Sequence, residues 1–243
     1  MRSSGGIADP EREAGRRRLR GHLSARAGDV WCLARRLPLQ TDANGLPIHG
    51  TMVGSFAWEV VRTAPARLVA RYAYENRAFP FPHELEIDAR VSERGLQVAM
   101  SPRPTGRRAV PVSFGCHPYF KAERTARLRV PACRHLELDE RGIPTGRSDR
   151  RPAQELGVAE GPLDDHYALG RDRTFVLHRR KLDVEIRFGP TYPYAQLFAP
   201  PGKRFVAVEP MTAPTDALVT GAAPLVKPGT TFRAVFVVRA VLL

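Results

Sequence analysis

In Glu84-Leu85-Glu86-Ile87-Asp88-Ala89-Arg90-Val91, charged and apolar residues alternate at every position. Because successive side chains of a β-strand point to opposite faces, this pattern predicts a strand with one buried face and one wet face. Ser92-Glu93-Arg94-Gly95 then fits a hairpin loop, and Leu96-Gln97-Val98-Ala99-Met100 fits the returning strand. This part of the chain therefore predicts an antiparallel pair of strands.

Short segments of the same period recur from residue 54 onward, separated by glycine, proline or charged turns. Their spacing of about ten residues is typical of an antiparallel sandwich or barrel. The 22 prolines suit loops and strand ends, and no long segment keeps a helical period. The chain is therefore predicted to be all-β, with strands at 56–61, 68–74, 84–91, 96–100, 174–177, 182–188, 194–198, 205–208 and 232–238.

The N-terminal part of the chain lacks this alternation. Residues 1–36 contain the charged run Glu11-Arg12-Glu13-Ala14-Gly15-Arg16-Arg17-Arg18-Leu19-Arg20. We expect a charged, mobile arm over 1–36, with at best a short helix. A single domain is expected over 37–243, since no linker divides that range.

The formal net charge is +13, which invites a nucleic-acid or anionic-lipid partner. The basic residues are instead scattered through strand-like segments, as at Arg71, Arg129 and Arg187. No basic stripe with interleaved aromatic residues is present in the sequence. We therefore expect a solvated basic surface and no nucleic-acid partner.

The apolar runs and the cysteines exclude further classes. No run approaches the roughly 18 apolar residues of a membrane span, and residues 1–30 lack the apolar core of a secretory signal. These features predict a cytoplasmic protein with no membrane partner. Cys32, Cys116 and Cys133 cannot close a disulfide framework and lie in no zinc-like cluster, so neither structural zinc nor redox chemistry is expected.

Two side chains suited to proton transfer near neutral pH stand at predicted strand ends. His117 lies in Gly115-Cys116-His117-Pro118-Tyr119-Phe120, after a predicted strand over 110–115. Glu209 follows the apolar run 205–208 and precedes Pro210. Each also has a structural explanation, as a hydrogen-bonded core or turn histidine and as a solvated strand end.

Two other segments carry candidate polar groups. Asp164-Asp165-His166-Tyr167 follows Gly161-Pro162 and suits a turn, a weak metal site or a hydrogen-bonding clamp, with turn chemistry as the default. His49 lies in Asn44-Gly45-Leu46-Pro47-Ile48-His49-Gly50, where glycine permits close approach of a ligand.

Together and in this order, these segments resemble the aldose 1-epimerase (galactose mutarotase) family and its epimerase-like branch, over roughly 37–243. The resemblance rests on Leu46-Pro47-Ile48-His49-Gly50, Phe56-Ala57-Trp58-Glu59-Val60, His117-Pro118-Tyr119-Phe120, Leu163-Asp164-Asp165-His166-Tyr167 and Val208-Glu209-Pro210-Met211-Thr212. It implies a large antiparallel β-sandwich of the galactose mutarotase type. The open face of that sandwich would hold a monosaccharide, and no metal or organic cofactor would be needed.

The resemblance also implies a role for each matching residue. Glu209 matches the general base on the anomeric hydroxyl, and His117 matches the general acid toward the ring oxygen. His49, Asp164 and Gln196 match residues that contact the sugar. The implied activity is interconversion of the α and β anomers of an aldose. Two alternatives stay open: a non-catalytic carbohydrate-binding domain, and an enzyme for phosphorylated hexoses, which the many arginines would suit.

The N-terminal part departs from the family pattern. Members carry several strands and a sugar-holding arginine upstream of the His49 motif, and residues 1–36 contain neither. Either that portion is absent or scrambled, or the chain is a shortened relative with a different edge. We therefore expect a sandwich that lacks some N-terminal edge strands and can self-associate through an exposed sheet edge.

Overall fold

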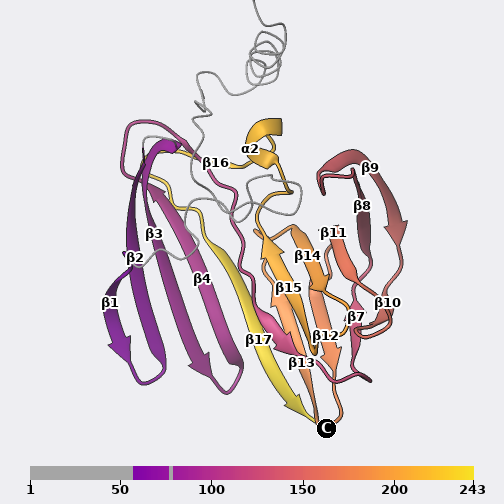
Figure 1. The fold of residues 1–243 in the computed structure, drawn as a ribbon. Helices are drawn as coiled ribbons and strands as arrows, with labels where there is room; N and C mark the ends of the chain where they lie inside the picture. The colour runs from indigo at the N-terminus through magenta and orange to yellow at the C-terminus, as the bar shows by residue number, and fades with distance from the viewer. Residues whose placement is uncertain (1–56, 77–78) are drawn as a thin grey trace, which may run out of the picture.

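The computed structural model describes residues 57–76 and 79–243, and their regular secondary structure is almost entirely β-strand (Figure 1). The strands are β1 (Glu59–Ala64), β2 (Arg67–Asn76), β3 (Phe79–Ser92), β4 (Gly95–Pro104), β5 (Val110–Pro111), β6 (Tyr119–Lys121), β7 (Arg127–Val130), β8 (Cys133–Leu138), β9 (Pro144–Arg151), β10 (Gln154–Gly157), β11 (Leu163–Leu169), β12 (Thr174–His178), β13 (Leu182–Phe188), β14 (Tyr194–Ala199), β15 (Phe205–Met211), β16 (Leu225–Val226) and β17 (Ala234–Leu242). One short helix, α2 (Ala217–Thr220), follows β15. No helix within the described ranges has the length and apolarity needed to cross a membrane.

The strands form two large antiparallel sheets. The first has nine strands in the order β1-β2-β3-β4-β17-β13-β12-β7-β10, and the second has six in the order β6-β15-β14-β11-β8-β9. Strands β1 to β4 extend to one side of the molecule, and β17 joins them to the rest of the nine-stranded sheet (Figure 1). A two-stranded β16-β5 pair completes the described fold.

The core lies between the two large sheets. Phe175, Ile186 and Phe236 enter it from the nine-stranded sheet, while Leu197 and Val208 enter it from the six-stranded sheet. The alternation that predicted strands also explains this packing, because in β14 every second residue is buried. The predicted all-β sandwich is therefore confirmed.

Several local predictions differ from the structure. The six short strands between 119 and 169 were not predicted, since three of them are only three or four residues long and most lack clean alternation. The default turn assignment for Asp164-Asp165-His166-Tyr167 is wrong, because β11 pairs with β14 on one side and with β8 on the other. The strand predicted over 110–115 is limited to β5, and β15 continues through Glu209 to Met211. The arm predicted over 1–36 lies outside the described residues.

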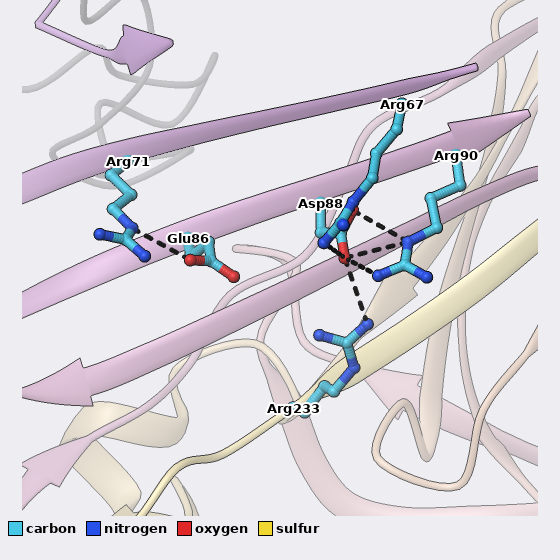
Figure 2. A network of polar contacts seen from close by, with 6 residues as sticks. All are labelled: Arg67, Arg71, Glu86, Asp88, Arg90 and Arg233. Atoms are coloured by element: carbon cyan, nitrogen blue, oxygen red, sulfur yellow. Dashed lines mark hydrogen bonds and ion pairs between the residues drawn. The ribbon is translucent and has the colours of Figure 1, made fainter. Parts of the chain in front are cut away.

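The outer face of the nine-stranded sheet carries a buried carboxylate surrounded by arginines (Figure 2). The Asp88 side chain is 3% exposed and accepts hydrogen bonds from Arg67 Nε at 2.8 Å and a terminal nitrogen of Arg90 at 2.7 Å. A terminal nitrogen of Arg233, next to the start of β17, lies 3.8 Å away. The Arg90 and Arg67 guanidinium groups hold the pKa of Asp88 well below its usual range. The network ties β2 and β3 to the segment that enters β17.

We predict that Asp88→Asn lowers the free energy of unfolding by about 1–3 kcal/mol at neutral pH, because it weakens hydrogen bonds to a buried group. A depressed carboxyl pKa stabilises the fold above the unfolded pKa, and this contribution is lost as the pH falls toward the folded pKa. The difference between wild type and variant should therefore be full above pH about 4 and shrink below it. Urea unfolding across this pH range measures it.

The matched control is Glu86→Gln on the same strand and face. The Glu86 side chain is 28% exposed and pairs with Arg71 at 3.0 Å (Figure 2). An exposed pair of this kind contributes about 0–1 kcal/mol. Equal losses for the two variants would contradict a special role for the buried carboxylate.

Candidate functional site

The outward face of the six-stranded sheet brings together three polar side chains in one row. Glu209 of β15 lies directly opposite Gln196 of β14, and Gln196 lies directly opposite His166 of β11. Directly opposed residues of antiparallel strands share a face. Because the alternate residues Leu197 and Val208 fill the core, this row faces away from it.

The loop that carries His117 is held against the end of β15 by backbone hydrogen bonds. The Thr212 N–H donates to the Phe114 carbonyl at 2.9 Å, and the Cys116 N–H donates to the Pro210 carbonyl at 3.2 Å. The Phe114 N–H donates to the Thr212 hydroxyl at 3.0 Å. These contacts bring His117 to Glu209, with Nε2 and Oε1 3.1 Å apart.

The approach of this loop to β15 requires a glycine at position 115. A Cβ atom built on Gly115 would lie 2.6 Å from the backbone oxygen of Pro210. Real Cβ contacts are essentially never that short, and a backbone oxygen in a strand cannot move aside as a side chain can. The glycine therefore permits the spacing that sets His117 beside Glu209.

The Glu209 carboxyl is buried near a second acid. Its side chain is 14% exposed, and burial, followed by the negative charge of Asp164, raises the pKa of Glu209 to about 8. A protonated glutamate and a neutral His117 hold the same number of protons as a carboxylate and an imidazolium. A proton shift across the 3.1 Å contact can therefore convert one form into the other.

Aromatic rings fix the orientation of the His117 ring. His117 stacks on Tyr119, with ring centroids 4.5 Å apart and planes at 20°. Phe198 meets it edge-on at 6.3 Å and 80°. The Tyr119 hydroxyl lies 3.4 Å from Nε2 of His117, which places it near the acid–base contact. Tyr119 belongs to the quoted histidine motif, but the sequence predicted no role for it.

A second chain of contacts runs along β11 and β14. The Gln196 amide nitrogen donates to Asp164 Oδ1 at 2.7 Å, and Gln196 Oε1 lies 2.9 Å from Nδ1 of His166. His166 is completely buried, whereas Asp164 is exposed. The structure thus places a carboxylate and an amide, both able to bind hydroxyl groups, on the face that carries the His117–Glu209 pair.

Four of the five candidate residues named from the sequence therefore meet on one face: His117, Glu209, Asp164 and Gln196. His49 lies outside the described residues. The sequence missed His166, although it stands two residues after Asp164. Once that segment is read as a strand, period two puts both side chains on the same face.

Among the described residues, neither the cysteines nor the residues able to bind metals form a second candidate site. Burial raises the pKa of Cys116 to about 11, and burial likewise raises the pKa of Cys133 to about 11, so both remain thiols at neutral pH. Within residues 57–76 and 79–243, no three His, Cys, Asp or Glu side chains come together as metal ligands would.

Comparison with known protein families gives one match over most of the chain. The family model for aldose 1-epimerase matches residues 32–239. A search of curated proteins found no significant match.

Solved structures of similar fold include proteins from two bacteria and a nematode. A galactose mutarotase-like protein from Clostridium acetobutylicum has 19% sequence identity and a TM-score of 0.74, covering 86% of this chain and 73% of its own. A protein from Synechocystis has 26% identity and a TM-score of 0.66, covering 76% of this chain and 66% of its own. An aldose epimerase homologue from C. elegans has 18% identity and a TM-score of 0.63, and the match covers 76% of this chain and 69% of the homologue.

The raised pKa of Glu209 predicts a stability that falls as the pH rises. The folded chain keeps a proton on Glu209 up to pH about 8, whereas the unfolded chain releases it near 4.5. Since glutamine does not titrate, Glu209→Gln should gain stability relative to wild type as the pH rises, by up to about 5 kcal/mol between these two limits. Urea unfolding at several pH values measures the gain.

The control for this prediction is Val208→Ala at the neighbouring core position. It should lower stability by leaving a cavity, by an amount that does not depend on pH. If the Glu209→Gln difference is also constant with pH, then burial does not perturb Glu209 as described.

Proposed function

Because the chain belongs to the aldose 1-epimerase family, we propose that it interconverts the α and β anomers of an aldose by ring opening and re-closure. The family and fold support a sugar epimerase or mutarotase type of function. The observation that carries the finer proposal is the 3.1 Å contact between His117 Nε2 and Glu209 Oε1. This contact supports an acid–base pair made of these two side chains, on the face that carries Asp164 and Gln196.

In the proposed reaction, the Glu209 carboxylate takes the proton of the hydroxyl on C1. His117 gives a proton to the ring oxygen, the bond between C1 and that oxygen breaks, and C1 becomes a carbonyl carbon. Rotation about C1–C2 presents the other face of the carbonyl. The former ring oxygen then attacks C1 as both protons return, and the product is the other anomer.

The close spacing of the pair suits this chemistry. The anomeric oxygen and the ring oxygen are bonded to the same carbon, so the base and the acid that serve them must also be close together. Only one proton is needed on the pair at the start, and the raised pKa of Glu209 supports its retention at neutral pH. Binding of the sugar would favour the form with a carboxylate and an imidazolium.

Asp164 and Gln196 would hold the sugar in register with this pair. Asp164 is exposed and its carboxylate accepts hydrogen bonds, while the Gln196 amide nitrogen donates them. A pyranose presents several hydroxyl groups that can serve as both donors and acceptors. The two residues therefore provide complementary contacts beside the reacting carbon.

A phosphorylated hexose is a second candidate substrate, favoured by one observation. Arg134 and Arg150 lie directly opposite each other on β8 and β9, on the same face as the site. Among the described residues, neither of them pairs with a carboxylate; Arg134 donates to the hydroxyl of Ser148 at 2.7 Å. Two such guanidinium groups can bind a phosphate group. Comparing a hexose with its 6-phosphate distinguishes the two substrates.

We predict that Glu209→Gln and His117→Asn each lower the rate of anomer interconversion by about 10²- to 10⁴-fold, because each removes one proton transfer. NMR of freshly dissolved α-anomer follows the reaction, and the rate without protein is subtracted. Glu209→Gln keeps the size of the side chain, and His117→Asn replaces the imidazole by a smaller polar group that does not titrate.

Equal rates for the two variants and the wild type would contradict the proposed acid–base roles. Saturable sugar binding by the wild type with no rate enhancement would indicate a non-catalytic carbohydrate-binding domain instead. Calorimetric titration with the same sugar measures that binding.

We also predict that Gly115→Ala lowers kcat by about 10- to 100-fold, because the new methyl group displaces the loop that carries His117. The matched control is Gly106→Ala, since a Cβ there would meet its nearest neighbour at 3.8 Å, an ordinary contact. Wild-type kcat in the Gly115 variant, with its fold intact by circular dichroism, would show that the position of this loop does not limit catalysis.

A further inference from the structure

We propose that His166 is a positioning residue that fixes the hydrogen-bonding pattern which Gln196 and Asp164 present to the sugar. The inference rests on the proposed function for its effect on turnover. It goes beyond that function because His166 would act only through Gln196. None of the contacts observed for His166 involves His117 or Glu209.

The His166 ring is held rigidly. Its exposed fraction is 0%, and it stacks on Tyr194 with ring centroids 5.9 Å apart and planes at 6°. Tyr194 stands on β14 two residues before Gln196, so both partners of the ring lie on the same strand and face. A ring held in this way offers its Nδ1 to Gln196 in one orientation.

The donors and acceptors in this chain of contacts allow one assignment. An ionised Asp164 only accepts hydrogen bonds, so the Gln196 group at 2.7 Å must be the amide NH2. The amide oxygen then faces Nδ1 of His166 at 2.9 Å. Because an amide oxygen only accepts, Nδ1 must carry the hydrogen.

The ring is also uncharged in this arrangement. Burial lowers the pKa of His166, which keeps the imidazole neutral at neutral pH. Nε2 is buried and has no hydrogen-bond partner among residues 57–76 and 79–243. A hydrogen on Nε2 would be a buried donor without an acceptor. The surroundings of Nε2 therefore favour the same neutral form, with the hydrogen on Nδ1, as the contact with Gln196 does.

Without this donor, nothing on β11 holds the Gln196 amide oxygen. The amide would then be held only at its NH2 end, by Asp164, and its oxygen could swing about that contact. Asp164 and Gln196 would no longer present one acceptor and one donor in fixed directions. The affinity for the sugar should therefore fall. The rate of the proton transfers at His117 and Glu209 should change less, because Glu209 lies on the other side of Gln196 from His166.

A double-mutant cycle tests this role. His166→Phe keeps the buried ring and its stack on Tyr194 but removes the donor, and it should raise KM by about 3- to 10-fold, as expected for one lost hydrogen bond. Its kcat should change by less than about threefold. If His166 acts through Gln196, His166→Phe combined with Gln196→Leu should bind no more weakly than Gln196→Leu alone. Losses that multiply would overturn the proposal.

The matched control is His135→Phe on the adjacent strand β8. His135 contacts Asp165 at 2.9 Å, and its partner across the ladder is Tyr167, a core residue, so it lies on the opposite face. This variant should keep wild-type KM. An equal rise in KM for the His135 variant would assign the effect to general loosening of the sheet and overturn the specific role.

A spectroscopic measurement on the wild type needs neither activity nor a folded variant. The ¹⁵N shifts of the His166 ring at neutral pH should show a protonated Nδ1 and an unprotonated Nε2. A ring protonated on Nε2, or on both nitrogens, would overturn the proposal. If the protein does not interconvert anomers, the proposed function is wrong. The ring spectrum still tests the protonation of His166. The double-mutant cycle is then measured with sugar dissociation constants in place of KM.

Discussion

The hydrogen bonds between residues 114–116 and the end of β15 are the contacts on which the site depends. They bring His117, which lies on a loop, to Glu209, which lies within a strand far along the sequence. The contacts are made mainly by backbone groups, so they set position without specifying side chains, and Gly115 is required because the backbones approach so closely. The His117–Glu209 contact is therefore a product of chain packing against the end of β15.

The same strand register serves the core and the site. In β14 and β15, one set of alternate residues fills the space between the sheets, and the other set includes Gln196 and Glu209 of the polar row. A slip of one residue in β14 would exchange Leu197 with Gln196, burying an amide and exposing a leucine. The hydrophobic core thus holds the polar row in its register, and the site gains precision from strands on both sides.

The sequence predicted the sandwich and the family because alternation and motif order are local properties of the chain. The family match over residues 32–239 confirms the resemblance, and the two packed sheets confirm the fold class. It could not predict the strands between 119 and 169, where pairing with neighbouring strands overrides polar and turn-like composition, as in β11, which pairs on both sides. For the same reason His166 was missed: its role depends on which residue lies opposite, and register is a property of the folded sheet.

Burial keeps the Glu209 carboxyl group largely out of contact with water. A buried carboxylate next to Asp164 is unfavourable when charged, and the pKa of about 8 means that the folded chain holds it as the neutral acid near neutral pH. In the proposed mechanism, the proton needed on His117 is therefore already present on its neighbour, 3.1 Å away. His166 is kept neutral by the same burial, so it adds no positive charge that would compete with His117 for the influence of the two acids. The site thus has one proton that can move, at the contact between Glu209 and His117 where the proposed reaction requires it.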